Sequence, residues 1–360
     1  MSQTTIKGVN IQGIASAVPE HIRTVEDDAR LFPDSDVLKI SKSTGVLKRH
    51  VVTGSLSTSD LCFAAAERLL DESRVGRDSI DTLIFVSQTP DFILPATSCS
   101  LHGRLRLEKR CASFDVNLGC SGYIYGLWLA SSLIACGSAK RVLLLVGDTI
   151  TRIASPKDRS VALLFGDAGT ATLLEKDDSA APMSFVLGTD GSGQENLIVP
   201  AGGFRSPRTE KTGLSTEREG GNIRSDEDLY MNGPEIFTFT LKEVPGMIKS
   251  LVTDYDEVDA VVMHQANKFM LDFIAKNLKI PKDKLILTLE NYGNTSSASI
   301  PLAMTVALAE KLKSTSLNLL LAGFGVGYSW GAVTLTCGPM IMPELVIVPD
   351  AAAMQPRQEE

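Results

Sequence analysis

Three short polar segments each follow an apolar run of the sequence, and each carries a side chain able to do chemistry. The first segment runs from Asn117 to Gly122 and contains Cys120, with Gly119 immediately before it. We expect this segment to join a strand to a helix, because glycines permit the tight turn that such a junction needs. A cysteine at a helix N-terminus lies near unpaired N–H groups and the positive end of the dipole, which favour the thiolate. Cys120 is therefore our candidate nucleophile, although a cysteine that only packs in the core fits this segment as well.

The other two segments supply a histidine and an asparagine. His264 comes directly after the apolar run 261–263, where it can point into a pocket at the edge of a sheet, although a buried structural histidine fits the same pattern. Asn294 lies in the segment 291–298 and could instead cap the helix that follows. The glycine-rich stretch 323–331 is predicted to be a turn between strands whose backbone N–H groups can face a developing oxyanion.

The elements that must position these residues alternate between strands and helices, which predicts an α/β protein. Strands are expected over 80–87, 112–117, 141–147, 258–263, 285–289, 317–322 and 332–336. Helices are expected over 96–107, 121–136, 268–278 and 299–313, and a hairpin is expected to pair 161–164 with 169–174.

The alternation occurs twice, which predicts two pseudo-duplicated halves joined through the polar link 176–182. We place the first half at 1–178, with the nucleophile, and the second at 179–342, with the histidine and the asparagine. A C-terminal tail follows over 343–360, with a frayed end from 351. Residues 205–228 are strongly polar and are predicted to form a solvated loop.

The composition excludes several classes of protein. With 360 residues, 44% hydrophobic residues and a net charge of −8, the chain is neither disordered nor a basic nucleic-acid-binding protein. Its six cysteines form no C-x-x-C pair, so we expect free thiols and no metal site. Apolar runs are far shorter than the roughly 20 residues of a membrane helix, and the N-terminus has no secretion signal. We therefore expect a cytoplasmic protein that contacts neither membrane nor nucleic acid.

Together the motifs resemble the β-ketoacyl-acyl-carrier-protein synthase III family. Cys120, the HQAN segment from His264, the NYGNTS segment from Asn291 and the GFGVGYSWG stretch from Gly323 occur in that family's order and approximate spacing. The resemblance extends from about Gly8 to Thr336. It implies a thiolase-like fold of five αβαβα layers, a homodimer and no cofactor.

The resemblance also implies a reaction. Cys120 would take the acyl group of a thioester, delivered by coenzyme A or acyl carrier protein, while the backbone N–H groups of Cys120 and Val326 hold the oxyanion. His264 and Asn294 would bind malonyl-acyl carrier protein, whose decarboxylation yields the enolate for a Claisen condensation in fatty-acid or specialised lipid or polyketide biosynthesis. The positions that match substrate-binding residues of the family are Leu94, Arg159, Phe165 and Asn232.

The sequence departs from the family at the donor site. Lys39 and Ser43 stand where the family has a tryptophan and an arginine that enclose the adenine of coenzyme A, which favours a carrier-bound or unusual donor. Leu94 matches a position that reaches into the acyl pocket of the partner subunit. An acidic carrier protein needs a basic surface, for which the candidates are Lys268, Lys276, Arg205, Arg208 and Lys211.

Two other functions are compatible with the motifs. Cys120 could pass its acyl group to an alcohol or amine, with His264 as the general base and without forming a carbon–carbon bond. Alternatively, the chain could be an inactive partner subunit, although the intact Cys, His and Asn set argues against this. A degradative thiolase is disfavoured, since Cys337 lies on the wrong side of the glycine-rich stretch to act as its second cysteine.

Overall fold

Two β-sheets form the frame of the computed structural model, which describes residues 2–350. The first sheet has the strand order β17-β2-β8-β7-β5-β6 and the second has the order β1-β9-β16-β15-β14. The strands of the first sheet are β2 (Val9–Pro19), β5 (Thr82–Val86), β6 (Ala112–Val116), β7 (Arg141–Asp148), β8 (Ala168–Lys176) and β17 (Val346–Val348). The strands of the second sheet are β1 (Ser2–Ile6), β9 (Met183–Thr189), β14 (Ala260–Met263), β15 (Leu317–Gly325) and β16 (Ser329–Cys337).

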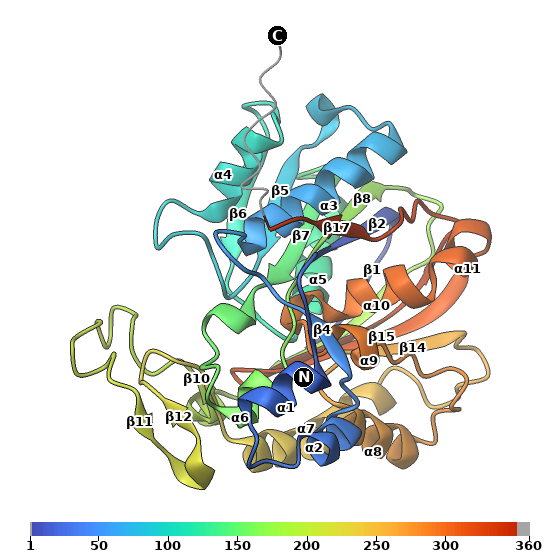
Figure 1. Ribbon diagram of the computed structural model, residues 1–360. Coiled ribbons are helices and arrows are strands. Elements are labelled where there is room, and N and C mark those ends of the chain that lie inside the picture. Colours follow the sequence, from blue (N-terminus) through green and yellow to red (C-terminus); the bar gives the residue numbers. More distant parts are fainter. Residues whose placement is uncertain (1, 351–360) are drawn as a thin grey trace.

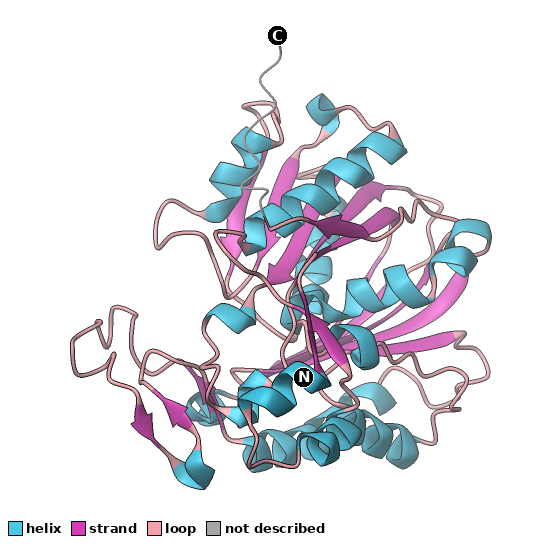
Figure 2. Cartoon of the chain, in the orientation of Figure 1, coloured by secondary structure: helices cyan, strands magenta, loops and turns pink. Residues whose placement is uncertain are grey.

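Helices fill three layers around these sheets. Between the sheets lie α5 (Gly122–Ala135) and α10 (Ser299–Ala307), each of which contacts strands of both sheets. The outer face of the first sheet is covered by α3 (Thr58–Ser73) and α4 (Thr97–Arg104), and that of the second by α7 (Gly233–Lys249) with α8 (Lys268–Leu278) packed beside it. Figures 1 and 2 show these helices on the two outer sides and between the sheets. The five-layered αβαβα order is confirmed.

The sequences of the central helices explain their position. Most side chains of α5 are apolar or small, and those of α10 lack charge, so neither helix has a face suited to water. Close approach of α5 to the first sheet needs a glycine, since a Cβ at Gly126 would lie 2.9 Å from a methyl of Leu144 on β7.

Shorter elements surround this core. They are β3 (Ile22–Thr24), α1 (Val25–Leu31), α2 (Val37–Thr44), β4 (Lys48–His50), α6 (Arg159–Ala162), α9 (Leu289–Tyr292) and α11 (Ala309–Ser314). Two small hairpins pair β10 (Leu197–Ile198) with β13 (Tyr230–Met231) and β11 (Thr216–Glu217) with β12 (Ile223–Arg224). The segment that carries β11 and β12 extends away from the layers (Figure 1).

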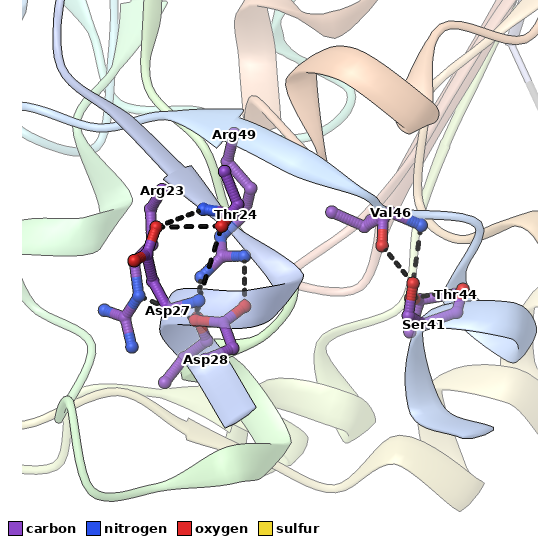
Figure 3. Close-up of polar contacts among 9 residues, drawn as sticks. Arg23, Thr24, Asp27, Asp28, Ser41, Thr44, Val46 and Arg49 are labelled. Atoms are coloured by element: carbon purple, nitrogen blue, oxygen red, sulfur yellow. Dashed lines mark hydrogen bonds and ion pairs between the residues drawn. The ribbon is translucent and has the colours of Figure 1, made fainter. Parts of the chain in front are cut away.

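A buried ion pair fixes the N-terminal elements to the segment that leads into the site. Arg49 and Asp28 are 1% and 2% exposed, and the guanidinium donates to both carboxylate oxygens at 2.6 and 2.9 Å. Figure 3 shows Arg23 on the same carboxylate, with Nε donating at 2.6 Å. Arg49 also donates to the carbonyl oxygen of Ala162 at 2.8 Å, three residues before Phe165. Removing one member of such a pair leaves a buried charge unpaired, at a cost of about 3–5 kcal/mol.

The structure corrects several sequence-based expectations. Residues 161–164 do not pair with 169–174, because β8 pairs with β7 and β2 while α6 occupies the preceding segment. The expected strand 285–289 makes one isolated bridge from Leu285 to Val261, and α9 begins at Leu289. The expected helix 299–313 is interrupted at Leu308. Most of the glycine-rich stretch is strand, and the turn is confined to residues 326–328.

The predicted division of the chain stays a prediction. The point between residues 178 and 179 lies in the link from β8 to β9. β1 pairs with β9 of the second sheet and β17 pairs with β2 of the first, so each end of the described chain joins the sheet formed mainly by the other half. The tail residues 351–360 lie outside the described residues.

Candidate active site

Cys120, His264 and Asn294 lie together where the ends of several strands meet. Cys120 follows β6, His264 follows β14 and Asn294 follows α9. All three are buried, and all three line one cavity of about 80 Å³. Cys120 and His264 are 144 positions apart in the sequence, and His264 and Asn294 are 30 positions apart. The two sheets bring them to the same cavity, as we expected for residues at the ends of strands.

The Cys120 thiol lies among hydrogen-bond donors but is fully buried. Burial raises the pKa of Cys120 to about 11, although the backbone N–H of Val326, the Ser296 hydroxyl and the backbone N–H of Cys120 itself oppose this. The negative charge of Asp148 adds to the increase. Burial thus opposes the thiolate that a position at a helix N-terminus favours.

Alkylation tests this order of thiol reactivity. Cys136 is exposed and the hydrogen bond from Ser138 lowers its pKa, so iodoacetamide at pH 7 should modify Cys136 before Cys120. Alkylation of Cys120 should then accelerate about tenfold per pH unit above pH 7, because the thiolate fraction grows at that rate below the pKa. Peptide mapping by mass spectrometry separates the two sites, and a Cys136→Ala variant serves as the control. Faster alkylation of Cys120 than of Cys136 at pH 7 would contradict the raised pKa of Cys120.

His264 is held as a neutral imidazole. Burial lowers its pKa to about 3, and a hydrogen bond to the Ser296 backbone offsets part of that decrease. Its Nδ1 lies 2.7 Å from the Ser299 hydroxyl oxygen, which also accepts the Gln265 N–H at 3.4 Å. If the Ser299 hydroxyl donates to Nδ1, the proton of the neutral ring is on Nε2. At neutral pH this residue can donate a hydrogen bond but is a poor general base.

Asn294 is oriented by its own turn. Its Oδ1 accepts the backbone N–H of Ser296 at 2.9 Å, and its Nδ2 donates to the Ala266 carbonyl oxygen at 3.3 Å. The oxygen is therefore occupied, and the nitrogen keeps a second hydrogen for a ligand in the cavity. The backbone of Asn294 is tied at 3.0 and 3.1 Å to Leu164 and Gly166, which flank Phe165.

Glycine is required where β15 passes the nucleophile. A Cβ at Gly325 would lie 2.7 Å from the Cys120 sulfur, so a larger residue would displace the thiol. Val326 comes next, and the conformation of this turn directs its N–H to the same sulfur. Two backbone N–H groups, those of Cys120 and Val326, thus lie beside the sulfur, and they stay our candidate donors for an oxyanion formed on a carbon bound to it.

A second cavity of about 310 Å³ opens on the other side of Cys120. Its lining is mainly apolar, and its aliphatic and aromatic members are Ile150, Ile153, Phe165, Leu197, Ile198, Val199, Leu229 and Val326. Cys120, Phe165 and Leu197 line both cavities. The thiol therefore lies where two mainly apolar cavities adjoin, and the smaller of them also contains His264 and Asn294.

The structure separates the remaining predicted residues from these cavities. Asn232 caps α7 by accepting the Glu235 N–H at 3.4 Å, and its neighbours Met231 and Gly233, rather than Asn232, line the small cavity. The Arg159 guanidinium donates to the Gly220 carbonyl and the Ser35 hydroxyl, at 2.8 and 3.1 Å. Leu94 lies in the loop after β5 and is 78% exposed.

Sequence reasoning missed three residues that contact the site. Ser296, Ser299 and Asp148 touch the side chains or the turn described above. Ser296 and Ser299 could have been found by their closeness to Asn294 in the sequence. Asp148 is the last residue of a buried strand, and the end of a buried strand was also the signal that indicated His264. Within residues 2–350, no three His, Cys, Asp or Glu side chains gather as a metal site would require, and no helix is long and apolar enough to span a membrane.

Comparison with known proteins agrees with this fold. Residues 114–191 match the family profile of 3-oxoacyl-[acyl-carrier-protein (ACP)] synthase III, and residues 250–337 match that of its C-terminal region. A β-ketoacyl-[acyl-carrier-protein] synthase III of Xanthomonas campestris pv. campestris is 34% identical over 90% of this chain and 97% of its own length. One of Rhodopirellula baltica is 36% identical over 91% and 97%.

A solved structure is similar over the same extent. The 3-oxoacyl-(acyl-carrier protein) synthase of Burkholderia xenovorans LB400 superposes with a TM-score of 0.91, at 43% identity over 96% of this chain and 99% of that one. The five layers with their strand-end site are those of a thiolase-fold enzyme. The chain belongs to the β-ketoacyl-acyl-carrier-protein synthase III family.

Proposed function

We propose that this chain is an acyltransferase that joins an acyl group to a malonyl thioester by decarboxylative Claisen condensation, in fatty-acid or specialised lipid biosynthesis. The observation that carries the proposal is the convergence of Cys120, His264 and Asn294 on one cavity, with two backbone N–H groups directed at the Cys120 sulfur. Relatives named β-ketoacyl-[acyl-carrier-protein] synthase III support it.

In the first step Cys120 attacks the carbonyl carbon of an acyl thioester. The N–H groups of Cys120 and Val326 stabilise the tetrahedral oxyanion, the donor thiolate leaves with the thiol proton, and the acyl group remains on the sulfur. The apolar cavity of about 310 Å³ beside Cys120 takes the acyl chain.

In the second step a malonyl thioester occupies the small cavity. Hydrogen bonds from His264 Nε2 and Asn294 Nδ2 hold its thioester oxygen, and they strengthen as that oxygen gains charge. The bond to the carboxylate breaks and releases carbon dioxide, and its electron pair forms the enolate. The enolate carbon then attacks the acyl carbon that is bound to Cys120. The carbon–sulfur bond breaks, and the Cys120 sulfur leaves as the thiolate.

The neutral state of His264 disfavours acyl transfer to an alcohol or amine. That reaction requires a general base whose pKa lies near the operating pH, whereas burial lowers the pKa of His264 to about 3. A hydrogen-bond donor for an enolate, in contrast, needs only a proton on Nε2, which a neutral imidazole can carry.

The direct test of the function measures both products. The protein is incubated with a panel of acyl-coenzyme A and acyl-carrier thioesters together with malonyl-acyl carrier protein. The expected result is an acyl adduct on Cys120, release of carbon dioxide and a β-ketoacyl thioester. Ester or amide formation without carbon dioxide release would instead identify simple acyl transfer.

The carrier protein is proposed to dock beside the small cavity, on α8. This helix is capped by Asn267, a cavity-lining residue, and carries Lys268 at its first position and Lys276 near its end. Lys268 forms an ion pair with Asp272 on the same helix. Arg205, Arg208 and Lys211 lie on the projecting segment near β11, and Arg208 pairs with Glu227 at 3.4 Å. Helix α8 is the better candidate because it adjoins the cavity.

A second copy of the chain is the proposed partner of the loop after β5. Three consecutive residues of this loop, Phe92, Ile93 and Leu94, are 64%, 75% and 78% exposed. Burying each of these side chains in an interface would contribute about 1.5–3 kcal/mol to the free energy of association, which favours a dimer. β6 is also an edge strand of the first sheet, with one row of backbone groups unpaired by other strands of the described chain.

We predict that the double variant Ile93→Asp, Leu94→Asp is monomeric, because two charges would have to be buried in the interface. Sedimentation velocity should give a dimer for the wild type and a monomer for the variant. Leu214→Asp, a control at a 62% exposed position on the projecting segment, should remain dimeric. A monomeric wild type would refute the proposed dimer.

A further inference from the structure

Asp148 is a buried carboxylate that the proposed mechanism does not use. It is 0% exposed, and among residues 2–350 it forms no ion pair with a basic side chain. Its Oδ1 accepts hydrogen bonds from the loop after β5, namely Ser87 Oγ at 3.1 Å, the Gln88 N–H at 2.7 Å and Thr89 Oγ1 at 3.4 Å. Its Oδ2 accepts the N–H and the hydroxyl of Ser297, at 3.1 and 2.6 Å. Burial raises the pKa of this carboxyl group, whereas the hydrogen bonds from Ser297 and Gln88 lower it. Five hydrogen bonds to one buried carboxyl group indicate a specific role.

The turn that Asp148 holds contacts every member of the candidate catalytic set. Ser296, next to Ser297, donates its N–H to Asn294 Oδ1 at 2.9 Å. Its backbone raises the pKa of the His264 imidazole, and its hydroxyl lowers the pKa of the Cys120 thiol, so Ser296 lies beside both side chains. A small displacement of Ser296 would therefore act most directly on Asn294, whose Oδ1 accepts its N–H.

The conformation of Ser296 needs an external restraint. Its φ of +49° lies in the left-handed region, which costs a residue with a Cβ about 1 kcal/mol or more. The two bonds from Ser297 to Asp148 Oδ2 supply that restraint from β7, a buried strand of the first sheet. The carboxylate thus connects the sheet to the turn.

We propose that Asp148 is the positioning residue of the condensation step: by holding Ser297 it keeps Ser296 left-handed and so directs the amide nitrogen of Asn294 into the small cavity. This inference rests on the proposed function, since the decarboxylation step is where Asn294 acts. Asp148 itself lines neither cavity, and it acts through the residues that its oxygens hold, the turn at Ser297 and the loop at Gln88.

A carboxylate is required here because both of its oxygens accept. A carboxamide has one accepting oxygen and one donating nitrogen. In an Asp148→Asn variant the nitrogen would face either the N–H of Ser297 or that of Gln88, and one of the two segments would lose its anchor. The same variant removes the negative charge that raises the pKa of Cys120, so that alkylation of the thiol should become faster.

The two half-reactions provide the test. In Asp148→Asn we expect malonyl-thioester decarboxylation, measured as carbon dioxide release, to fall about 100-fold, as misplacement of a catalytic group does. Acylation of Cys120, measured by intact-protein mass spectrometry, should change by less than about tenfold. Ser297→Ala keeps the backbone bond but loses the hydroxyl bond, so its decarboxylation should fall by about tenfold.

Asp167→Asn is the matched control. Asp167 is also 0% exposed and accepts three hydrogen bonds, from the Val52 and Thr151 N–H groups and the Thr151 hydroxyl, but it does not contact the turn 294–297. It should lower the melting temperature without changing the ratio of the two half-reaction rates. If decarboxylation and acylation fall equally in Asp148→Asn, the proposal is overturned. If Asp148→Asn does not fold, Ser297→Ala decides, and an unchanged decarboxylation rate in that variant would overturn the proposal.

A crystal structure of Ser297→Ala or Asp148→Asn provides a second test, which does not depend on activity. The proposal expects the bond from the Ser296 N–H to Asn294 Oδ1 to lengthen beyond hydrogen-bonding distance, and an unchanged turn would overturn it. If the wild type releases no carbon dioxide from malonyl thioesters, the proposed function fails, and this structural comparison still decides whether Asp148 holds the turn.

Discussion

Replacing Cys120 with alanine should abolish the acyl-enzyme and lower the condensation rate by more than about 10³-fold, the order of loss found when a nucleophile is removed. The reason is geometric, since the backbone N–H groups of Cys120 and Val326 converge on this sulfur and the apolar cavity opens beside it. Among the described cysteines, Cys120 alone lines either cavity. Intact-protein mass spectrometry after incubation with acyl thioesters measures the adduct.

The same variant should keep the decarboxylation of malonyl thioesters. That step uses the hydrogen bonds of His264 and Asn294, neither of which is altered by the loss of the sulfur. Release of carbon dioxide without a condensed product is thus the expected behaviour of Cys120→Ala. Cys136→Ala, which changes an exposed thiol outside both cavities, should behave as the wild type. An acyl adduct that persists on Cys120→Ala would refute the nucleophile assignment.

The convergence of the three candidate residues followed from the family resemblance, because Cys120 follows a strand of the first sheet, His264 follows a strand of the second and Asn294 follows a helix. The strand-to-helix junction at Cys120 and the strand before His264 were predicted correctly, since long apolar runs and adjacent glycines mark them clearly. The five layers followed from the family resemblance rather than from periodicity.

What could not be predicted depends on contacts between distant segments. The bond from Ser297 to Asp148 joins residues 149 positions apart, and no local pattern indicates it. The segment 285–289 has the composition of a strand, yet it makes one isolated bridge, from Leu285 to Val261 on the edge strand β14. The raised pKa of Cys120 also escaped prediction, since burial is a property of the folded chain.

Replacing Asn294 with aspartate should have the opposite effect to Cys120→Ala, because it should impair decarboxylation and spare acylation. At neutral pH the new carboxylate would repel the enolate and offer no hydrogen, so malonyl decarboxylation should fall by about 10²–10³-fold, the loss seen when an oxyanion donor is removed. Acylation of Cys120 should persist, because its oxyanion is held by backbone N–H groups. Mass spectrometry and carbon dioxide release measure the two steps on the same samples.

The pH dependence of this variant distinguishes charge repulsion from a merely displaced turn. Burial raises the pKa of a carboxyl group, and once protonated it can donate a hydrogen bond as the amide does. Decarboxylation by Asn294→Asp should therefore recover as the pH falls from 8 toward 5, whereas Asn294→Ala, which lacks both charge and donor, should show no such recovery. A parallel pH profile for the two variants would contradict the donor role of Asn294.

His264 should not complicate that comparison. Burial lowers its pKa to about 3, so the imidazole is neutral throughout pH 5–8 and becomes cationic only near pH 3. The wild-type decarboxylation rate should accordingly show no inflection near 6.5, the pKa of an unperturbed histidine. An inflection at that pH which disappears in His264→Gln would show that the ring titrates in the working range, and would restore His264 as a possible general base. Its absence leaves hydrogen-bond donation as the role that the buried ring can perform.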